Sequence, residues 1–156
     1  MINIKIRTQF RNKNMKLPEY AKLSDSGMDV QANIEHKIPI IHGSTLLIPT
    51  GIFVELPETP NEDFNWEIQV RPRSGLAYKE GLTVLNSPGT IDQGYRNEIG
   101  VLLHSTRKEA YVIHPADRIA QIVLSKSYKI NWVTSDTLND SDRGQGGFGS
   151  TGVSSV

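Results

Sequence analysis

The segment Trp66-Glu67-Ile68-Gln69-Val70 decides the fold class, because its apolar and polar side chains alternate one by one. Successive side chains of a β-strand point to opposite faces, so this spacing predicts a strand with one buried and one solvated side. Similar short runs recur along the chain between turn residues. They predict further strands at Ile2–Arg7, Ser44–Pro49, Gly51–Leu56, Leu82–Leu85, Glu98–His104, Ala110–His114 and Ile119–Leu124.

A single short helix is expected between Ser74 and Gly81. Serine is a frequent N-cap, Leu76–Glu80 supply about one turn and a half, and glycine readily takes the left-handed conformation that ends a helix. Many short strands with almost no helix predict an all-β fold, which is a β-sandwich, jelly roll or barrel.

The composition argues against several classes of protein. The 156 residues, 37% of them hydrophobic, suit a single domain. Lys plus Arg number 17, as do Asp plus Glu, so no basic field is present to attract a nucleic acid. Without cysteine there is no disulfide, thiol nucleophile or cysteine zinc site. No apolar run suits a membrane helix or a signal peptide, so a cytoplasmic protein without membrane or nucleic-acid partners is expected.

The stretch Arg143–Gly152 is half glycine, yet it carries one guanidinium, one aromatic ring and two hydroxyl groups. It cannot bury enough apolar surface to fold alone, so we expect a flexible tail that follows the polar linker Ser135–Asp142. Its guanidinium suits phosphate oxygens and its ring, Phe148, suits a base, although an ordinary flexible C-terminus is the alternative. The expected organisation is a β domain at 1–134, followed by a linker and C-terminal arm at 135–156.

The turn-rich segment Asn86–Arg96 lies between two strand patterns and is a candidate for chemistry. The Asn86 amide can read the hydrogen-bonding edge of a base, Asp92 can hold a water molecule, and Tyr95 can pack against a sugar. Alternatively, Asp92 satisfies only the N–H groups of its own turn, and Tyr95 belongs to the core.

Three other segments carry charged groups that suit a ligand. Arg71–Gly75 brings arginine and serine to the start of the helix, where phosphates bind favourably; a capping serine beside a solvent-facing arginine is the alternative. Asp117 opens an apolar strand, where it can simply pair with Arg118. Ser24–Val30 places carboxylates in a glycine turn that suits either a metal ion or an ordinary surface. The four histidines have no metal-ligand spacing and are expected to be structural.

The segment Leu56–Asn65 is acidic and contains two prolines. These features predict a surface loop rather than part of the core. Contact between residues 57–65 and a protein partner is one hypothesis for its role.

Taken together, five of these segments resemble, in order, the five motifs of the trimeric dUTP diphosphatases, the dUTPases. This resemblance implies a jelly-roll-like β fold and a homotrimer whose active sites are shared, with the arm of one subunit closing over a neighbour's site. It also implies Mg²⁺-dependent hydrolysis of dUTP to dUMP and diphosphate, which keeps uracil out of DNA and supplies dUMP for dTMP synthesis. The matching segments are Asp25–Asp29, Arg71–Ala77, Gly89–Arg96, Asp117–Gln121 and Arg143–Gly152.

The resemblance implies a role for each matching residue of the hairpin. Asp92 is then the catalytic carboxylate that activates the water attacking the α-phosphate. Tyr95 packs under the deoxyribose and leaves no room for a 2′-hydroxyl. The implied uracil contacts are Asn86, Gly89, Thr90 and Ile91.

The other motifs supply the implied phosphate contacts and the lid. Asp29 matches an acidic position near the magnesium ion and is expected to act through the waters of the metal. Phe148 covers uracil. The remaining substrate-binding residues implied by the resemblance are Arg73, Ser74, Gly75 and Gln121 in the domain, and Arg143, Gly149, Ser150 and Thr151 in the arm.

Three positions depart from the family pattern. Asn97 and Ala116 stand where glycine is usual, and Met28 stands where tyrosine is usual. Asparagine tolerates left-handed backbone better than most residues.

Two other functions compete with the dUTPase interpretation. The related dCTP deaminases share the fold and release ammonia from cytosine, but the Gly89–Asp92 pattern and the Phe148–Gly152 tail favour a dUTPase. A non-catalytic binding or regulatory module on the same fold is the second alternative.

Overall fold

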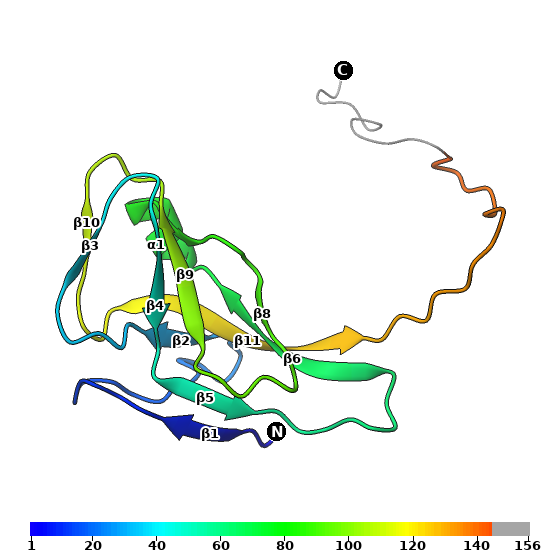
Figure 1. Cartoon of the computed structure of the whole chain (residues 1–156), viewed down its shortest axis with the longest axis horizontal. Helices are drawn as coiled ribbons and strands as arrows, with labels where there is room; N and C mark the ends of the chain where they lie inside the picture. Colours follow the sequence, from blue (N-terminus) through cyan, green and yellow to red (C-terminus); the bar gives the residue numbers. More distant parts are fainter. Residues whose placement is uncertain (145–156) are drawn as a thin grey trace.

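The computed structural model describes residues 1–144, whose strands and single short helix confirm the predicted all-β class. The strands pair out of sequence order, so the chain crosses repeatedly between sheets (Figure 1). The elements are β1 (Lys5–Thr8), β2 (Met28–Gln31), β3 (Ile38–Ile40), β4 (Thr45–Pro49), β5 (Ile52–Glu55), β6 (Phe64–Arg71), α1 (Ser74–Glu80), β7 (Leu82–Val84), β8 (Gly89–Ile91), β9 (Gly100–Ser105), β10 (Tyr111–Ile113) and β11 (Arg118–Tyr128).

The largest sheet has the order β2-β11-β6-β8, and its neighbouring strands are antiparallel. The predicted alternation in β6 is confirmed, because Ile68 and Val70 are buried. On the opposite face, the side chains of Glu67, Gln69 and Arg71 form a hydrogen-bonded row. This sheet therefore has the one buried and one polar side that the period-two pattern predicts.

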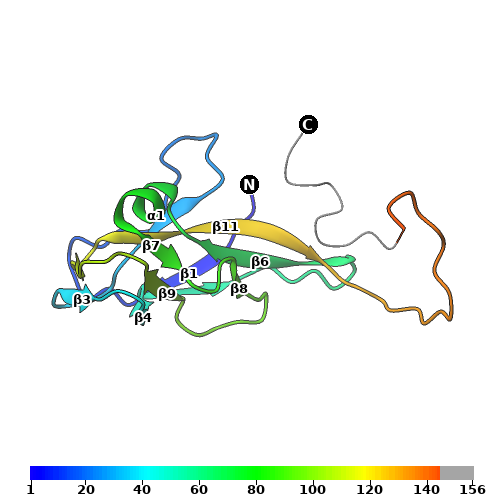
Figure 2. The same ribbon diagram turned by 90° about the horizontal axis from the view of Figure 1, so that it is seen from above.

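A second sheet has the order β4-β9-β7, and two smaller sheets pair β1 with β5 and β3 with β10. In Figure 2, β11 and β6 lie in one layer, with β4 and β9 in the layer beneath. Aliphatic side chains from both layers fill the space between them. The largest fully buried aliphatic side chains are Val30, Ile40, Ile48, Ile52, Leu56, Leu82, Ile99, Val101, Leu103 and Ile113, each less than 2% exposed.

Three strands, β2, β3 and β8, were not predicted from the sequence. Each has only three or four residues, and β3 and β8 contain Pro39 and Gly89, residue types that weaken a strand pattern. They form because β11, β10 and β6 provide pairing partners that lie far away in the sequence.

The prediction of a surface loop over Leu56–Asn65 has the wrong boundary at both ends. Leu56 is 1% exposed and belongs to the core, and Phe64 and Asn65 belong to β6. β6 starts early because β11 continues as far as Tyr128 and pairs with it along its whole length. The loop that remains, residues 57–63, is called the β5–β6 loop below.

Helix α1 confirms one predicted cap and corrects the other. Gly81 ends the helix in the left-handed conformation, with φ 61° and ψ 25°. The prediction that Ser74 caps the start is wrong, because Arg73 is the N-cap residue and no side-chain hydrogen bond caps the helix. Ser74 is instead the first helical residue, and its side chain is exposed.

After β11, residues 129–144 run away from the sheets without forming helix or strand (Figure 1). The side chains of the predicted linker 135–142 are exposed, as expected. Among the described residues, helices do not reach the length and apolar character that crossing a lipid bilayer requires.

Candidate active site

The predicted uracil-binding segment Asn86–Arg96 contains β8, but the expectation of a hairpin is wrong, because β8 pairs with β6 while the preceding strand β7 pairs with β9 in the other sheet. The segment 86–96 is called the hairpin segment below. Asn86 is exposed in the turn before β8, and its amide folds over Gly89: a Cβ built on Gly89 would lie 3.1 Å from Asn86 Nδ2. β8 is an edge strand, so one side of its backbone faces away from β6. The hairpin segment thus places the Asn86 amide beside the backbone of Gly89, Thr90 and Ile91, as a site that reads a base requires.

Asp92 follows β8 and begins a tight turn, in which the Tyr95 N–H donates to the Asp92 carbonyl at 3.0 Å. Within residues 1–144 the Asp92 carboxylate makes no hydrogen bond or ion pair, so it does not satisfy the N–H groups of its turn. Tyr95 is 36% exposed and therefore lies outside the core, and its hydroxyl donates to the Glu98 carbonyl at 2.9 Å. The carboxylate and the tyrosine ring are both accessible to a ligand.

The predicted phosphate-binding residues gather around Asp29 of β2. Arg73 Nε donates to Asp29 Oδ1 at 3.0 Å, and Arg118 Nη1 lies 3.4 Å from Asp29 Oδ2. Arg73 Nη1 also donates to the Arg118 carbonyl at 3.0 Å. The carboxylate thus holds two guanidinium groups side by side at one edge of the sheet, where they concentrate positive charge.

Arg118 does not pair with Asp117, which was the alternative drawn from the sequence. Asp117 instead accepts a hydrogen bond from the His114 N–H at 2.7 Å. Ala116, which stands where the family has glycine, takes a positive φ of 65° in this turn. Asn97 is not among the described non-glycine residues with positive φ.

Gln121 joins the phosphate cluster through the register of the sheet, because it lies opposite Asp29 of β2 and Arg71 of β6. Its Nε2 donates to the Pro72 carbonyl at 2.9 Å. Gly27 makes room for its amide, since a Cβ there would lie 2.2 Å from Gln121 Oε1. Asp29 and Gln121, with Arg118, line a pocket of about 650 Å³.

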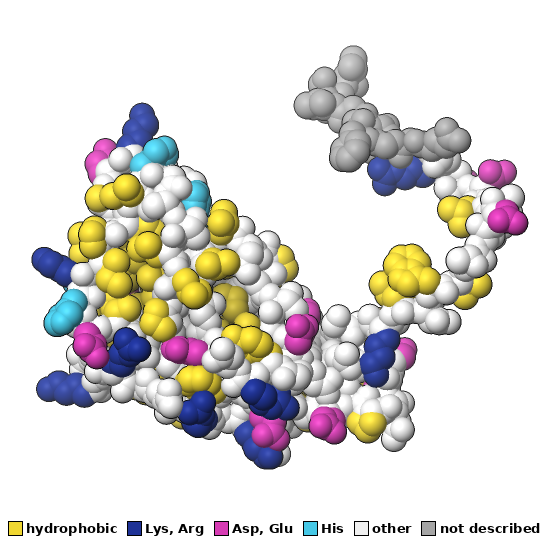
Figure 3. Space-filling view, in the orientation of Figure 1, with side chains coloured by type: hydrophobic (Ala, Val, Ile, Leu, Met, Phe, Trp, Pro, Cys, Tyr) yellow, Lys and Arg dark blue, Asp and Glu magenta, His cyan; other side chains and the backbone are white. Residues whose placement is uncertain are grey.

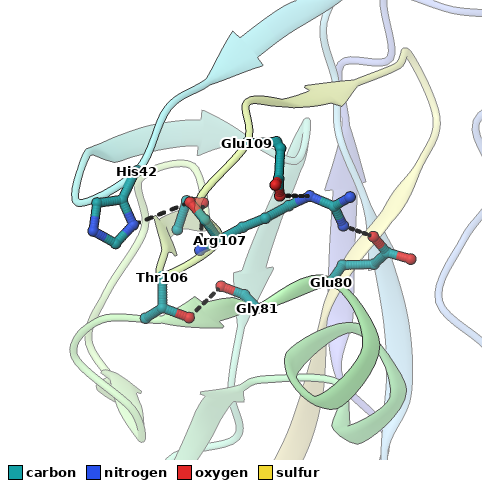
Figure 4. A network of polar contacts seen from close by, with 7 residues as sticks. His42, Glu80, Gly81, Thr106, Arg107 and Glu109 are labelled. Carbon is teal, nitrogen blue, oxygen red and sulfur yellow. Dashed lines mark hydrogen bonds and ion pairs between the residues drawn. The ribbon is translucent and has the colours of Figure 1, made fainter.

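Ser74 and Gly75 are exposed in the first turn of α1, beside this cluster. None of the residues of α1 is fully buried, and Leu76 packs partly buried against the core. Figure 4 shows the contacts at its other end, where Arg107 donates a charge-assisted hydrogen bond to Glu80. The Thr106 hydroxyl donates to the carbonyl of Gly81, the residue that ends the helix. These contacts fix the helix relative to the β9–β10 connection.

The Asp92 carboxylate and the phosphate cluster lie apart in a single chain. Ile91 is opposite Ile68 of β6, and Asp92 follows it. Arg71 lies three residues beyond Ile68 along β6. At about 3.3 Å per residue, this separates the two positions by about 10 Å. Gly89 lies opposite Val70, next to Arg71, whereas Asp92 follows the far end of β8, so within one chain the Asp92 carboxylate is set apart from the phosphate cluster.

Two contacts near the site were not predicted from the sequence. The sequence allowed Arg118 to pair with its neighbour Asp117, but it pairs with Asp29 of β2. Gln93 hydrogen bonds to Pro57 of the β5–β6 loop. Neither contact leaves a local signal, because the partners are 89 and 36 positions away.

The structure describes only the beginning of the predicted arm, and the predicted contacts of the arm stay predictions. Arg143 is exposed in a turn at residues 142–144 and has interaction partners of its own. Phe148, Gly149, Ser150 and Thr151 lie outside the described residues.

No group of three or more His, Asp or Glu side chains in residues 1–144 is arranged to hold a metal ion. Asp29, the predicted metal-side residue, already faces two guanidinium groups and is 33% exposed at its side chain. A magnesium ion here would need most of its ligands from substrate phosphates and water, which is the common arrangement for this ion.

The site combines an edge strand that can read a base, an exposed carboxylate and a cluster with two arginines. On a β-sandwich, these features define a nucleotide-binding class of protein. A family model described as dUTPase matches residues 13–152. The chain is 54% identical over 138 residues to a deoxyuridine 5′-triphosphate nucleotidohydrolase of Rickettsia bellii, covering 88% of each. It is 49% identical over 153 residues to the one of Alkaliphilus metalliredigens, covering 98% of this chain and 99% of the relative. The chain belongs to the dUTPase family.

Solved structures support the fold. The dUTPase of Staphylococcus bacteriophage 80alpha, solved with dUPNHPP, has a TM-score of 0.81 and 22% identity, covering 97% of this chain and 99% of that one. A mutant dUTPase from phage phi11 of S. aureus, whose structure reveals the coordination of a structural Mg(II) ion, has a TM-score of 0.72 and 18% identity, covering 86% of this chain and 97% of that one. The predicted jelly-roll-like fold is confirmed.

Proposed function

We propose that this chain hydrolyses dUTP to dUMP and diphosphate by directing water at the α-phosphate. In the cell this reaction keeps uracil out of DNA and supplies dUMP for dTMP synthesis. The observation that carries the proposal is the exposed Asp92 carboxylate, free of hydrogen bonds within the described residues and held at the end of the edge strand that carries Gly89.

Selectivity is assigned to the hairpin segment. The Asn86 amide and the backbone from Gly89 to Ile91 pair with the uracil edge, and cytosine presents the opposite donor and acceptor there. Leaving one such buried group unpaired costs about 1–3 kcal/mol. Tyr95, whose ring is fixed by its bond to the Glu98 carbonyl, packs against deoxyribose and excludes a 2′-hydroxyl.

Asp92 accepts a proton from the attacking water and aims its oxygen at phosphorus. General-base assistance of this kind contributes roughly 10²–10⁴-fold, and much of it depends on orientation. The turn closed by the Tyr95 N–H supplies that orientation on the protein side.

The triphosphate is held by the cluster around Asp29. Within residues 1–144, Arg73 uses two of its five N–H donors in the bonds to Asp29 and to the Arg118 carbonyl, so the others can reach phosphate oxygens. Ser74 and Gly75 add a hydroxyl and backbone amides at the exposed turn of α1, and Gln121 adds its amide. These residues neutralise and orient the leaving diphosphate.

Magnesium is proposed as the cofactor, with Asp29 reaching it through water. When bound, the ion neutralises charge on the phosphates and restricts their geometry. Asp29 also keeps Arg73 and Arg118 in place, because its two oxygens contact one guanidinium each.

A homotrimer is proposed because the Asp92 carboxylate and the phosphate cluster lie apart in one chain and can meet when copies combine. An apolar surface supports association: Leu47 of β4 lies opposite Leu102 of β9, and the Leu85 N–H donates to the Leu102 carbonyl. Leu47 is 67% exposed and Leu85 57%. Hydrophobic side chains gather on the face drawn in Figure 3, over β3, β4, β9 and β10. Such a patch is typical of a subunit contact.

The organisation proposed is a catalytic β domain at 1–134, and a linker and arm at 135–156 that closes over a neighbouring subunit's site. In the arm, Arg143, Ser150 and Thr151 contact the γ-phosphate, while Phe148 and Gly149 cover the nucleoside. A cytoplasmic location and the absence of nucleic-acid and membrane partners are also proposed. The contact of residues 57–65 with a protein partner stays a prediction.

A direct assay distinguishes the candidate functions. Full-length protein with Mg²⁺ is expected to release diphosphate from dUTP and no ammonia from dCTP. Ammonia from dCTP would favour a deaminase, and binding of dUTP without turnover would favour a regulatory module. Sedimentation of the wild type and of Leu47→Ser tests the trimer, because a polar residue at this position should weaken association.

A further inference from the structure

We propose that Gln93 is a positioning residue for Asp92. It does so by hydrogen bonding to the β5–β6 loop, which acts as a fixed support, or brace, for the turn. The inference rests on the proposed function and assigns this loop a role inside its own chain. Gln93 follows the catalytic carboxylate directly, and its side chain points to the loop rather than to the predicted ligand site.

One short hydrogen bond makes the link. Gln93 Nε2 donates to the Pro57 carbonyl at 2.6 Å, across 36 positions of sequence. The Thr59 hydroxyl lies 3.3 Å from Gln93 Oε1 and 2.8 Å from the Phe64 carbonyl. A hydroxyl has one proton, so the shorter bond to Phe64 takes precedence and Gln93 depends chiefly on Pro57.

Holding Gln93 restrains the carboxylate beside it. Gln93 is the second residue of the turn that the Tyr95 N–H closes on the Asp92 carbonyl. Arg96 Nη1 donates to the carbonyls of Gln93 and Tyr95 at 2.8 and 2.9 Å. With the Gln93 side chain tied to Pro57 and its carbonyl to Arg96, the backbone that carries the exposed Asp92 side chain is held from two sides.

The loop is suited to act as a brace because it is itself anchored. Leu56, which precedes the loop, is 1% exposed and Thr59 9% exposed, so both are fixed in the body of the domain. At the other end, the Lys129 N–H donates to the Asp63 carbonyl at 2.7 Å and Lys129 Nζ to the Glu62 carbonyl at 3.0 Å.

The hydrogen bonds of Gln93 join the loop to the hairpin segment beside an open pocket. A pocket of about 360 Å³ lies between them, with Pro60 on the loop side and Gly94 on the side of the hairpin segment among its lining residues. Loss of the Gln93 amide therefore removes the bond that ties the turn to the loop and leaves the turn held by the Tyr95 and Arg96 bonds.

The test compares Gln93→Met, which keeps the length of the side chain but removes the donor, with Asn61→Ala, an exposed position of the same loop. In Gln93→Met, kcat for dUTP is expected to fall about 10- to 100-fold, the scale associated with a misplacement of about 1 Å. KM and the affinity for a non-hydrolysable dUTP analogue should stay within about twofold. Asn61→Ala should match the wild type.

A second comparison separates positioning from general damage. In an Asp92→Asn background, Gln93→Met should cause no further loss of kcat, because the group it positions is already gone. Thr59→Val should lower kcat less than Gln93→Met does, and it provides a second readout if Gln93→Met folds poorly.

Wild-type kcat in both Gln93→Met and Thr59→Val, or an equal fractional loss from Gln93→Met with and without Asp92, overturns the positioning role while leaving the proposed function intact. A wild-type chain that releases no diphosphate from dUTP overturns both.

Discussion

Glu80 and Arg107 join the end of helix α1 to the β9–β10 connection by a charge-assisted hydrogen bond (Figure 4). Arg107 Nε is also 3.9 Å from the Glu109 carboxylate, and it is buried without a hydrogen-bond partner in the described chain. α1 packs against the core through the partly buried Leu76, and this pair adds a polar contact that restrains the helix end opposite Ser74 and Gly75.

Arg107→Met is therefore expected to lower the free energy of unfolding by about 1 kcal/mol, the scale of one partly exposed charged hydrogen bond. It should raise KM for dUTP severalfold and leave the affinity for dUMP unchanged, because dUMP lacks the outer phosphates. Urea denaturation and calorimetric titration measure both effects. Glu109→Gln is the control, since that carboxylate is 77% exposed; equal losses for dUTP and dUMP would contradict the assignment.

Gly89→Ala is expected to disturb uracil recognition with little loss of stability. The added methyl would lie 3.1 Å from Asn86 Nδ2 and 3.4 Å from Val70 Cβ, so the exposed Asn86 amide must move. Loss of one hydrogen bond predicts about a fivefold rise in KM for dUTP. Gly94→Ala on the same hairpin segment is the control, because its methyl would meet nothing within 4 Å. A normal KM in Gly89→Ala would argue against the Asn86 contact.

Asp92→Asn should bind a non-hydrolysable dUTP analogue normally and lose roughly 10²–10⁴-fold in kcat. The amide has similar size but cannot take a proton from water. Steady-state kinetics and analogue binding check the two halves of the prediction. Full turnover in this variant would remove Asp92 from its proposed role.

Removal of all residues after Asp142 should abolish most dUTP turnover while leaving the melting temperature nearly unchanged. The exposed linker 135–142 contributes no residue to the core, and the stacking contribution assigned to Phe148 is about 1–3 kcal/mol. Phe148→Ala should cause a smaller loss than truncation. A large drop in melting temperature after truncation would show that the arm stabilises the domain.

Burial raises the pKa of the Tyr111 hydroxyl above its ordinary value of 10.0, and the nearby carboxylates of Asp117 and Glu80 raise it further. The folded state then favours the neutral phenol, so the stabilisation is present below the unfolded pKa and is lost as pH rises through the raised folded pKa. The stability of the wild type should fall more steeply between about pH 8 and about pH 11 than that of Tyr111→Phe. Urea unfolding at both pH values tests this, and parallel curves would contradict it.

Much of the fold was predictable, because alternation depends on neighbouring residues. β6 and its inward Ile68 and Val70 follow from the period of two, and Gly81 ends α1 as its residue type predicts. β8 was not predicted, because its three residues begin with glycine and form a strand only when β6 is present to pair with them. The role of Ser74 also differed, because Arg73 takes the cap position.

The amino-acid sequence by itself determined the class of fold and the chemical groups available for a nucleotide: the Asp92 carboxylate, the Asn86 amide and the Arg73 guanidinium. The tertiary structure alone decided which groups meet. Asp29 binds Arg118, and Gln93 reaches the Pro57 carbonyl. Strand periodicity and turn preferences act over a few residues, whereas these contacts join segments that only strand pairing and loop folding bring together.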